Sequence, residues 1–133
     1  MKRLFCIIFI FLCFASCQKA PQDLLVGTWE ISSKSTYSTG NAATTVDNPA
    51  FYCVFEKSGD AKFINPEPST ELSLVNDYYF TYVYDKERSA IVFMTLEGRG
   101  NFSWIVDELT SVSLTCHSTS EVSSTTYYGR KMK

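Results

Sequence analysis

Residues 77–95, with the sequence DYYFTYVYDKERSAIVFMT, show the pattern that decides the fold. Two runs rich in aromatic and β-branched residues, 77–85 and 89–95, flank the polar turn Asp85-Lys86-Glu87-Arg88. Such a pair of runs around a short turn is typical of an antiparallel β-hairpin. Successive residues of a strand point to opposite faces, so the first run is predicted to place four aromatic side chains on one face: Tyr78, Phe80, Tyr82 and Tyr84.

The same pattern continues in both directions along the chain. Segments with period-two alternation recur from Gly27 onward, separated by clusters of Gly, Asp, Asn, Pro or Ser. Strands are predicted at residues 27–38, 50–57, 60–65, 77–85, 89–95, 100–107, 111–119 and 122–132. Because most connections are short, we predict an all-β, eight-stranded antiparallel up-and-down barrel.

Two predicted connections are longer than the others, at residues 39–49 and 65–76. They are the first and third connections of the meander, so both fall at the same end of the barrel. We expect that end to be the mouth and the opposite end to be closed.

The N-terminus has the three parts of a secretory signal. Lys2 and Arg3 precede an apolar run at residues 4–14, which is shorter than the roughly 20 residues of a membrane-spanning helix. The following Ala15-Ser16-Cys17 resembles a bacterial lipobox. We therefore predict a lipoprotein signal peptide at residues 1–16 with lipidation by acyl chains at Cys17, a tether at residues 17–24 and a barrel at residues 25–133. A plain secretory peptide cut after Ala15 or Ser16, which leaves Cys17 free, is the alternative.

Length and charge limit the classes of function. A chain of 133 residues is enough for one domain. The net charge of -2 argues against nucleic acid as a partner, and we expect membrane contact through the lipid anchor only. By resemblance to lipoprotein sorting in Gram-negative bacteria, Gln18 in place of Asp favours the outer membrane, on its periplasmic face. We expect a monomer.

Several motifs together resemble a known family. Gly27-Thr28-Trp29 has the Gly-x-Trp pattern that opens the first strand of lipocalins; a hairpin at residues 55–63, the stretch 104–114 and the closing residues 127–130 follow. The chain is therefore similar to the lipocalin-like domains of short Bacteroidetes lipoproteins. The resemblance implies a structural plug at the closed end in which Arg130 packs against Trp29, with Lys131 as a less favoured occupant.

The sequence offers little catalytic chemistry. His117 is the one histidine and follows Cys116 directly, so in a strand the two side chains point to opposite faces. We expect His117 to face outward, and we expect no enzymatic activity, no cofactor and no metal. Cys53 and Cys116 either form a disulfide or stay as buried thiols; a separation of about 14 Å across two intervening strands favours the thiols.

The aromatic face of residues 78–84 and the serine-rich strands near the mouth suggest the function. We expect a modest cavity in the mouth half, lined by Tyr37, Tyr128 and the aromatic face together with small residues: Ser33, Ser35, Ser124 and Thr126. Such a cavity would bind a small hydrophobic or amphipathic molecule. Alternatively, the aromatic face of residues 78–84 fills the core or lies on the outer wall of the barrel. The alternative is a filled barrel that acts as a protein-interaction or inhibitor module through its long loops.

Overall fold

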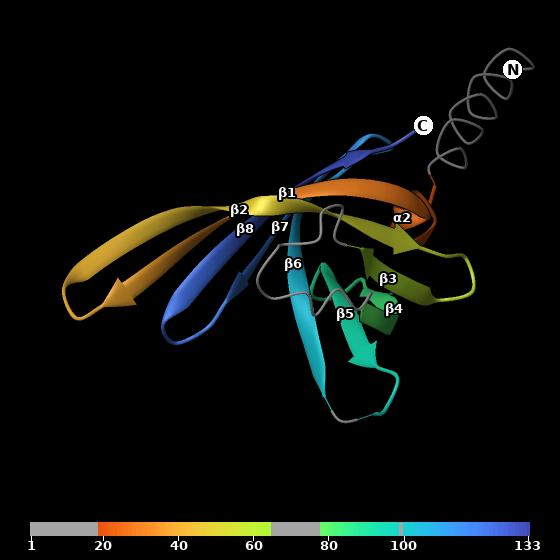
Figure 1. Cartoon of the computed structure of the whole chain (residues 1–133). Helices are drawn as coiled ribbons and strands as arrows, with labels where there is room; N and C mark the ends of the chain where they lie inside the picture. Colours follow the sequence, from red (N-terminus) through yellow and green to blue (C-terminus); the bar gives the residue numbers. More distant parts are fainter. Residues whose placement is uncertain (1–18, 65–77, 99) are drawn as a thin grey trace, which may run out of the picture.

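The computed structural model describes residues 19–64, 78–98 and 100–133. Within these ranges eight antiparallel strands form a closed barrel, in which each strand pairs with the next and β8 pairs back to β1 (Figure 1). Their bounds are β1 (Gly27–Thr39), β2 (Ala42–Phe55), β3 (Asp60–Ile64), β4 (Tyr78–Asp85), β5 (Ala90–Thr95), β6 (Asn101–Leu109), β7 (Ser113–Thr119) and β8 (Ser123–Lys131). The predicted fold class is confirmed.

The prediction of a long loop at residues 39–49 is wrong. Gly40 and Asn41 alone join β1 to β2, and the pairing of the two strands begins at Thr39 and Ala42. Gly40 has a φ of +62°, a conformation that two-residue hairpin turns require. The two strands therefore form a long hairpin that projects beyond the rest of the barrel (Figure 1). The second expected loop, residues 65–76, lies outside the described residues.

A β-bulge in β2 changes which residues face the interior. Ile31 of β1 pairs with Phe51, whereas Ser33 pairs with Asn48, so β2 contains one extra residue between these pairs. Odd-numbered residues such as Phe51 and Cys53 face inward below the bulge, and Asn48 faces inward above it. The bulge thus places an amide beside the serines of β1.

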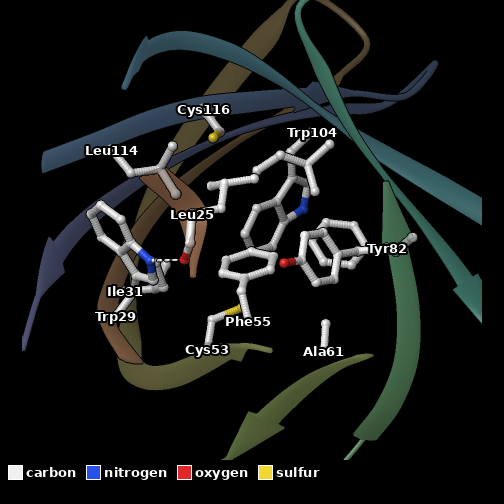
Figure 2. Packing of buried hydrophobic residues seen from close by; sticks show 12 residues of the cluster. Leu25, Trp29, Ile31, Cys53, Phe55, Ala61, Tyr82, Trp104, Leu114 and Cys116 are labelled. Carbon is white, nitrogen blue, oxygen red and sulfur yellow. Dashed lines mark hydrogen bonds between the residues drawn. The ribbon is translucent and has the colours of Figure 1, made fainter. Parts of the chain in front are cut away.

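The closed half of the barrel is filled with side chains (Figure 2). Its fully buried members include Phe55, Phe93, Ile91 and Leu114. The buried Tyr82 donates its hydroxyl hydrogen to the carbonyl oxygen of Glu56 over 2.9 Å. The core therefore satisfies its polar groups and leaves the open space of the barrel to the other half.

A short helix, α2 (Pro21–Leu25), seals the closed end where a tether was expected. Leu25 is fully buried, and its carbonyl oxygen accepts a hydrogen bond of 2.8 Å from the indole Nε1 of Trp29. Gln22 Oε1 accepts a hydrogen bond of 3.0 Å from the backbone N–H of Tyr84 in β4. Residues 21–24 of the predicted tether are thus part of the domain. Within the described ranges no helix is long and apolar enough to cross a membrane.

The structural plug contains Lys131 and not Arg130. Lys131 Nζ lies 4.9 Å from the ring centroid of Trp29 and donates hydrogen bonds to the carbonyl oxygens of Leu24 and Val26, over 2.6 and 3.0 Å. The side chain of Arg130 is 76% exposed and lies 3.5 Å from Glu30. The implied role of Arg130 is therefore wrong, because the odd-numbered residues of β8 face the interior.

Candidate functional site

The half of the barrel away from α2 contains an open pocket of about 410 Å³. Its walls come from β1, β2, β3, β6, β7 and β8. The residues around it are Ser33, Ser35, Asn48, Pro49, Phe51, Phe63, Phe102, Ser103, Trp104, Ser118, Thr125 and Tyr127.

The pocket lies where β6 changes its pairing partner. Residues 101–105 of β6 pair with β5, and residues 105–109 pair with β7, so the two neighbours share only Ile105. Ser103 of β6 and Ser118 of β7 line the pocket on either side of this divergence. Figure 1 shows β6 turning away from β7 and β8 toward β5.

One wall of the pocket is a stack of three aromatic rings. The Tyr127 and Trp104 rings are 4.2 Å apart at 22°, and the Trp104 and Phe63 rings are 5.4 Å apart at 17°. Phe51 meets both Trp104 and Tyr127 edge-on. The stack joins β8, β6 and β3, and its residues both line the pocket and pack in or against the buried core.

A second part of the pocket wall is polar. Ser33 and Ser35 are buried residues of β1. Asn48 Nδ2 donates a hydrogen bond of 2.8 Å to Ser35 Oγ, and the hydroxyl oxygens of Ser35 and Thr125 lie 2.9 Å apart. These bonds tie β2, β1 and β8 together across one face. The pocket is therefore amphipathic.

The structure places part of the expected cavity lining correctly. Ser33 and Ser35 line the pocket as predicted, but on β8 Thr125 and Tyr127 take the places expected for the even-numbered residues Ser124, Thr126 and Tyr128. Tyr128 is exposed, as is Tyr37 on the projecting hairpin. The prediction that the even-numbered residues of β8 line the cavity is therefore wrong.

The aromatic face of β4 fills the core instead of lining the pocket. Tyr82 is buried, and Phe80 and Tyr84 pack against the buried cluster, which agrees with their predicted shared face. Tyr78 is exposed at the start of the strand. None of the four is among the described residues around the pocket.

Asn48, Phe63, Thr125 and Tyr127 are pocket residues that the sequence analysis did not assign to a site. Pro49 was the available signal for Asn48, because proline within a strand pattern marks a bulge or an edge. Phe63 lies within the strand predicted at residues 60–65, and no face was assigned to it. Thr125 and Tyr127 are each followed by a residue of the same type, so the alternation of residue types could not show which face of the strand is inward.

The two cysteines within the described residues, Cys53 and Cys116, are buried free thiols, and no disulfide joins them. Burial raises the pKa of Cys53 well above its ordinary value, and the nearby Cys116 adds to this shift. Burial, with a contribution from the charge of Asp107, raises the pKa of Cys116 to about 12. Such thiols are poor nucleophiles because the thiolate is the reactive form.

His117 faces outward as expected. Its Nδ1 lies 2.7 Å from the carboxylate oxygen Oδ2 of Asp107. Across the part of the chain that the structure describes, no group of three or more His, Cys, Asp or Glu side chains is arranged to hold a metal ion.

Comparison with known proteins places this barrel in a class. No protein-family model and no curated protein sequence matches the chain. A solved structure, a lipocalin-like protein from Bacteroides uniformis, superposes with a TM-score of 0.53 and 18% sequence identity, over 82% of this chain and 99% of that chain. The protein has a lipocalin-like barrel fold, and the resemblance seen in the sequence is confirmed at the level of the fold.

Proposed function

We propose that this protein is a non-enzymatic binding protein of the cell envelope whose pocket holds a small hydrophobic or amphipathic molecule. The observation that supports this most is the open pocket of about 410 Å³ between an aromatic and a polar wall. Ligand sites are roughly 300–1,000 Å³ in volume and combine apolar walls with a few polar groups. Lipocalin-like barrels are typical of proteins that bind small hydrophobic ligands.

The proposal of a binding protein over an enzyme has support from the candidate nucleophiles. Cys53 and Cys116 are buried with raised pKa values. His117 points away from Cys116 and is engaged with Asp107 on the outer surface. None of these groups lines the pocket.

The proposed location is the periplasmic face of the outer membrane, with acyl chains on Cys17. The predicted signal peptide and Cys17 lie outside the described residues. The position of α2 supports the orientation, because this helix seals the closed end and begins four residues after the predicted anchor in the sequence. Ser35 lies six residues beyond Trp29 on β1, about 20 Å away at about 3.3 Å per residue. The pocket would therefore open away from the membrane.

Native mass spectrometry of the protein purified from its own host tests ligand binding. The wild type is expected to retain a small molecule. Ser33→Phe fills the pocket, and this variant should not retain the small molecule. Ser32→Phe, on the exposed outer face of the same strand, should still retain the small molecule. A mass equal to the acylated polypeptide alone for all three proteins would contradict the proposal.

The projecting β1–β2 hairpin favours a second candidate, a protein-interaction or inhibitor module. Tyr37 and Val46 are large exposed side chains on this hairpin. A photo-crosslinking amino acid at Val46 should capture a partner protein in cells if this candidate is correct, and one at the exposed Lys57 near the other end should not. Retention of a small molecule without a cross-linked partner would favour the pocket.

A further inference from the structure

The pocket contains a hydrogen-bond donor without a partner on an otherwise buried residue. Trp104 is 2% exposed, and no residue of the described ranges accepts a hydrogen bond from its indole Nε1. Figure 2 shows the difference from Trp29, whose Nε1 is joined by a dashed line to the oxygen of Leu25. Every fully enclosed side-chain nitrogen or oxygen of the described residues has a partner, so the Trp104 nitrogen is not fully enclosed, and Trp104 is one of the residues that line the pocket.

The polar wall adds both donors and acceptors. Asn48 uses one of its two amide hydrogens on Ser35, so one N–H and the amide oxygen remain. Ser35 and Thr125 have two hydroxyl hydrogens between them and use one in their mutual bond, so one hydroxyl hydrogen is also left. Ser33 forms no side-chain hydrogen bond with the described part of the chain. A hydroxyl group, which donates and accepts, complements this mixed set.

Charged groups are absent from the described lining of the pocket. The nearest charged side chains of β1 and β2, Lys34 and Asp47, lie on the outer face of these strands and pair with each other at 3.7 Å. A carboxylate or ammonium that enters a partly dehydrated site without an opposite charge pays a large desolvation cost. The pocket therefore disfavours an ionic head group of either sign.

We propose that the pocket selects an uncharged ligand whose polar part is a cluster of hydroxyl groups, as in a glyceride or glycoside, and that it rejects the carboxylate of a fatty acid. The hydroxyl cluster binds Asn48, Ser35, Thr125 and the indole N–H of Trp104. The apolar part of the ligand packs on Phe51 and Tyr127 at the aromatic wall. This inference rests on the proposed function and specifies its ligand.

Four probes with the same chain and different head groups test the proposal. They are octyl β-D-glucoside, 1-octanoylglycerol, octanoate and octylamine. The full-length protein as cells process it is reconstituted in phosphatidylcholine nanodiscs, and binding is measured by equilibrium dialysis of radiolabelled probes with empty nanodiscs subtracted. The two neutral probes are expected to bind at least tenfold more tightly than the two ions. A change in Trp104 fluorescence, absent in Trp104→Phe, places the bound probe in the pocket.

Variants on the two faces of β1 and β2 test the head-group contacts. Asn48→Leu and Ser35→Ala should each weaken octyl glucoside at least fivefold and change octanoate less than twofold. Ser32→Ala, on the outer face, should leave both unchanged. Trp104→Phe keeps an aromatic ring and removes the N–H, and it should also weaken octyl glucoside.

The outcomes separate the ligand class from the proposed function. Octanoate or octylamine binding as tightly as the neutral probes would overturn the ligand class and leave a binding protein. An equal loss of affinity for all four probes in Asn48→Leu would overturn the proposed head-group contacts and would also leave a binding protein. Failure of all four probes to bind at Trp104 would count against both the ligand class and the proposed function.

Discussion

Lys131 is the residue whose side chain closes the sealed end of the barrel. Its ammonium group donates to two carbonyl oxygens next to α2 and lies over the Trp29 ring. Lys131→Met keeps the aliphatic stem and leaves these carbonyls without their donor, which should lower the free energy of unfolding by about 1–3 kcal/mol. Arg130→Met removes an exposed ion pair with Glu30 and should change it by less than about 1 kcal/mol.

Urea unfolding of the two variants measures the difference. A similar decrease in the free energy of unfolding of both variants would show that the plug does not depend on which basic residue faces inward. This comparison also tests which face of β8 points to the interior, because only one of two consecutive strand residues can reach Trp29.

The two buried thiols predict a loss of stability at alkaline pH. The pKa of each thiol is higher in the folded protein than its ordinary value of 9.0, and that of Cys116 is about 12. The stabilisation is therefore complete below pH 9 and is lost as the pH rises toward 12, because the unfolded chain releases its thiol protons first. Each thiol contributes a slope of about 1.4 kcal/mol per pH unit in this window.

Urea titrations between pH 8 and 10.5 check this slope. Cys116→Ala should be less stable at pH 8 because of its cavity, yet its stability should fall less steeply with pH than that of the wild type. An equal slope in the two proteins would mean that Cys116 ionises as readily when folded as when unfolded.

At the scale of elements, β8 shows where sequence reasoning fails. Its sequence SSTTYYGRK is built mostly of doublets, Ser-Ser, Thr-Thr, Tyr-Tyr and Arg-Lys. Each pair places the same kind of residue on both faces, so the pattern predicts a strand but contains no information on which face is inward. Pairing with β1 and β7 decides it, and pairing depends on residues far away in the chain.

The long β2 strand was missed for a related reason. Residues 47–49, Asp-Asn-Pro, have the chemistry of a turn. In the structure Asp47 and Asn48 pair with Lys34 and Ser33 of β1, and the register shifts by one residue directly after them, at Pro49 and Ala50. The local turn chemistry therefore does not end the strand, because residues 42–48 pair with residues 33–39 of β1, and this pairing cannot be read from residues 47–49 alone.

Gly129 provides a test of the β8 face at the element scale. A Cβ atom at this position would lie 2.9 Å from Cδ1 of Ile31, 3.2 Å from Cβ of Leu114 and 3.3 Å from Cε3 of Trp29. Gly129→Val should therefore overpack the core and destabilise the protein by about 1–3 kcal/mol. Gly100→Val, where a Cβ meets no atom within 4 Å, is the matched control. A melting temperature unchanged in Gly129→Val would place the odd-numbered face of β8 outside.

At the scale of the molecule, periodicity predicted a closed eight-stranded barrel because each hairpin left a local signal. The pocket depends on a different kind of information. Phe51, Phe102 and Trp104 line the pocket, and the open space beside them lies where β6 leaves β7 and follows β5. That divergence involves three strands at once, and no period within β6 reveals it.

The attachment of the whole molecule to a membrane is the last prediction. Each buried methylene of an acyl chain contributes about 0.8 kcal/mol to membrane binding, so two or more chains hold a protein firmly. Cys17→Ser removes the predicted acylation site and should move the protein from the membrane fraction to the soluble fraction, with loss of the acyl mass. Cys13→Ser, four residues earlier in the predicted leader, should leave the protein anchored. Attachment that survives Cys17→Ser, or a soluble wild type without acyl mass, would show that Cys17 is not the anchor, and the proposed orientation of the pocket away from the membrane would then lose its basis.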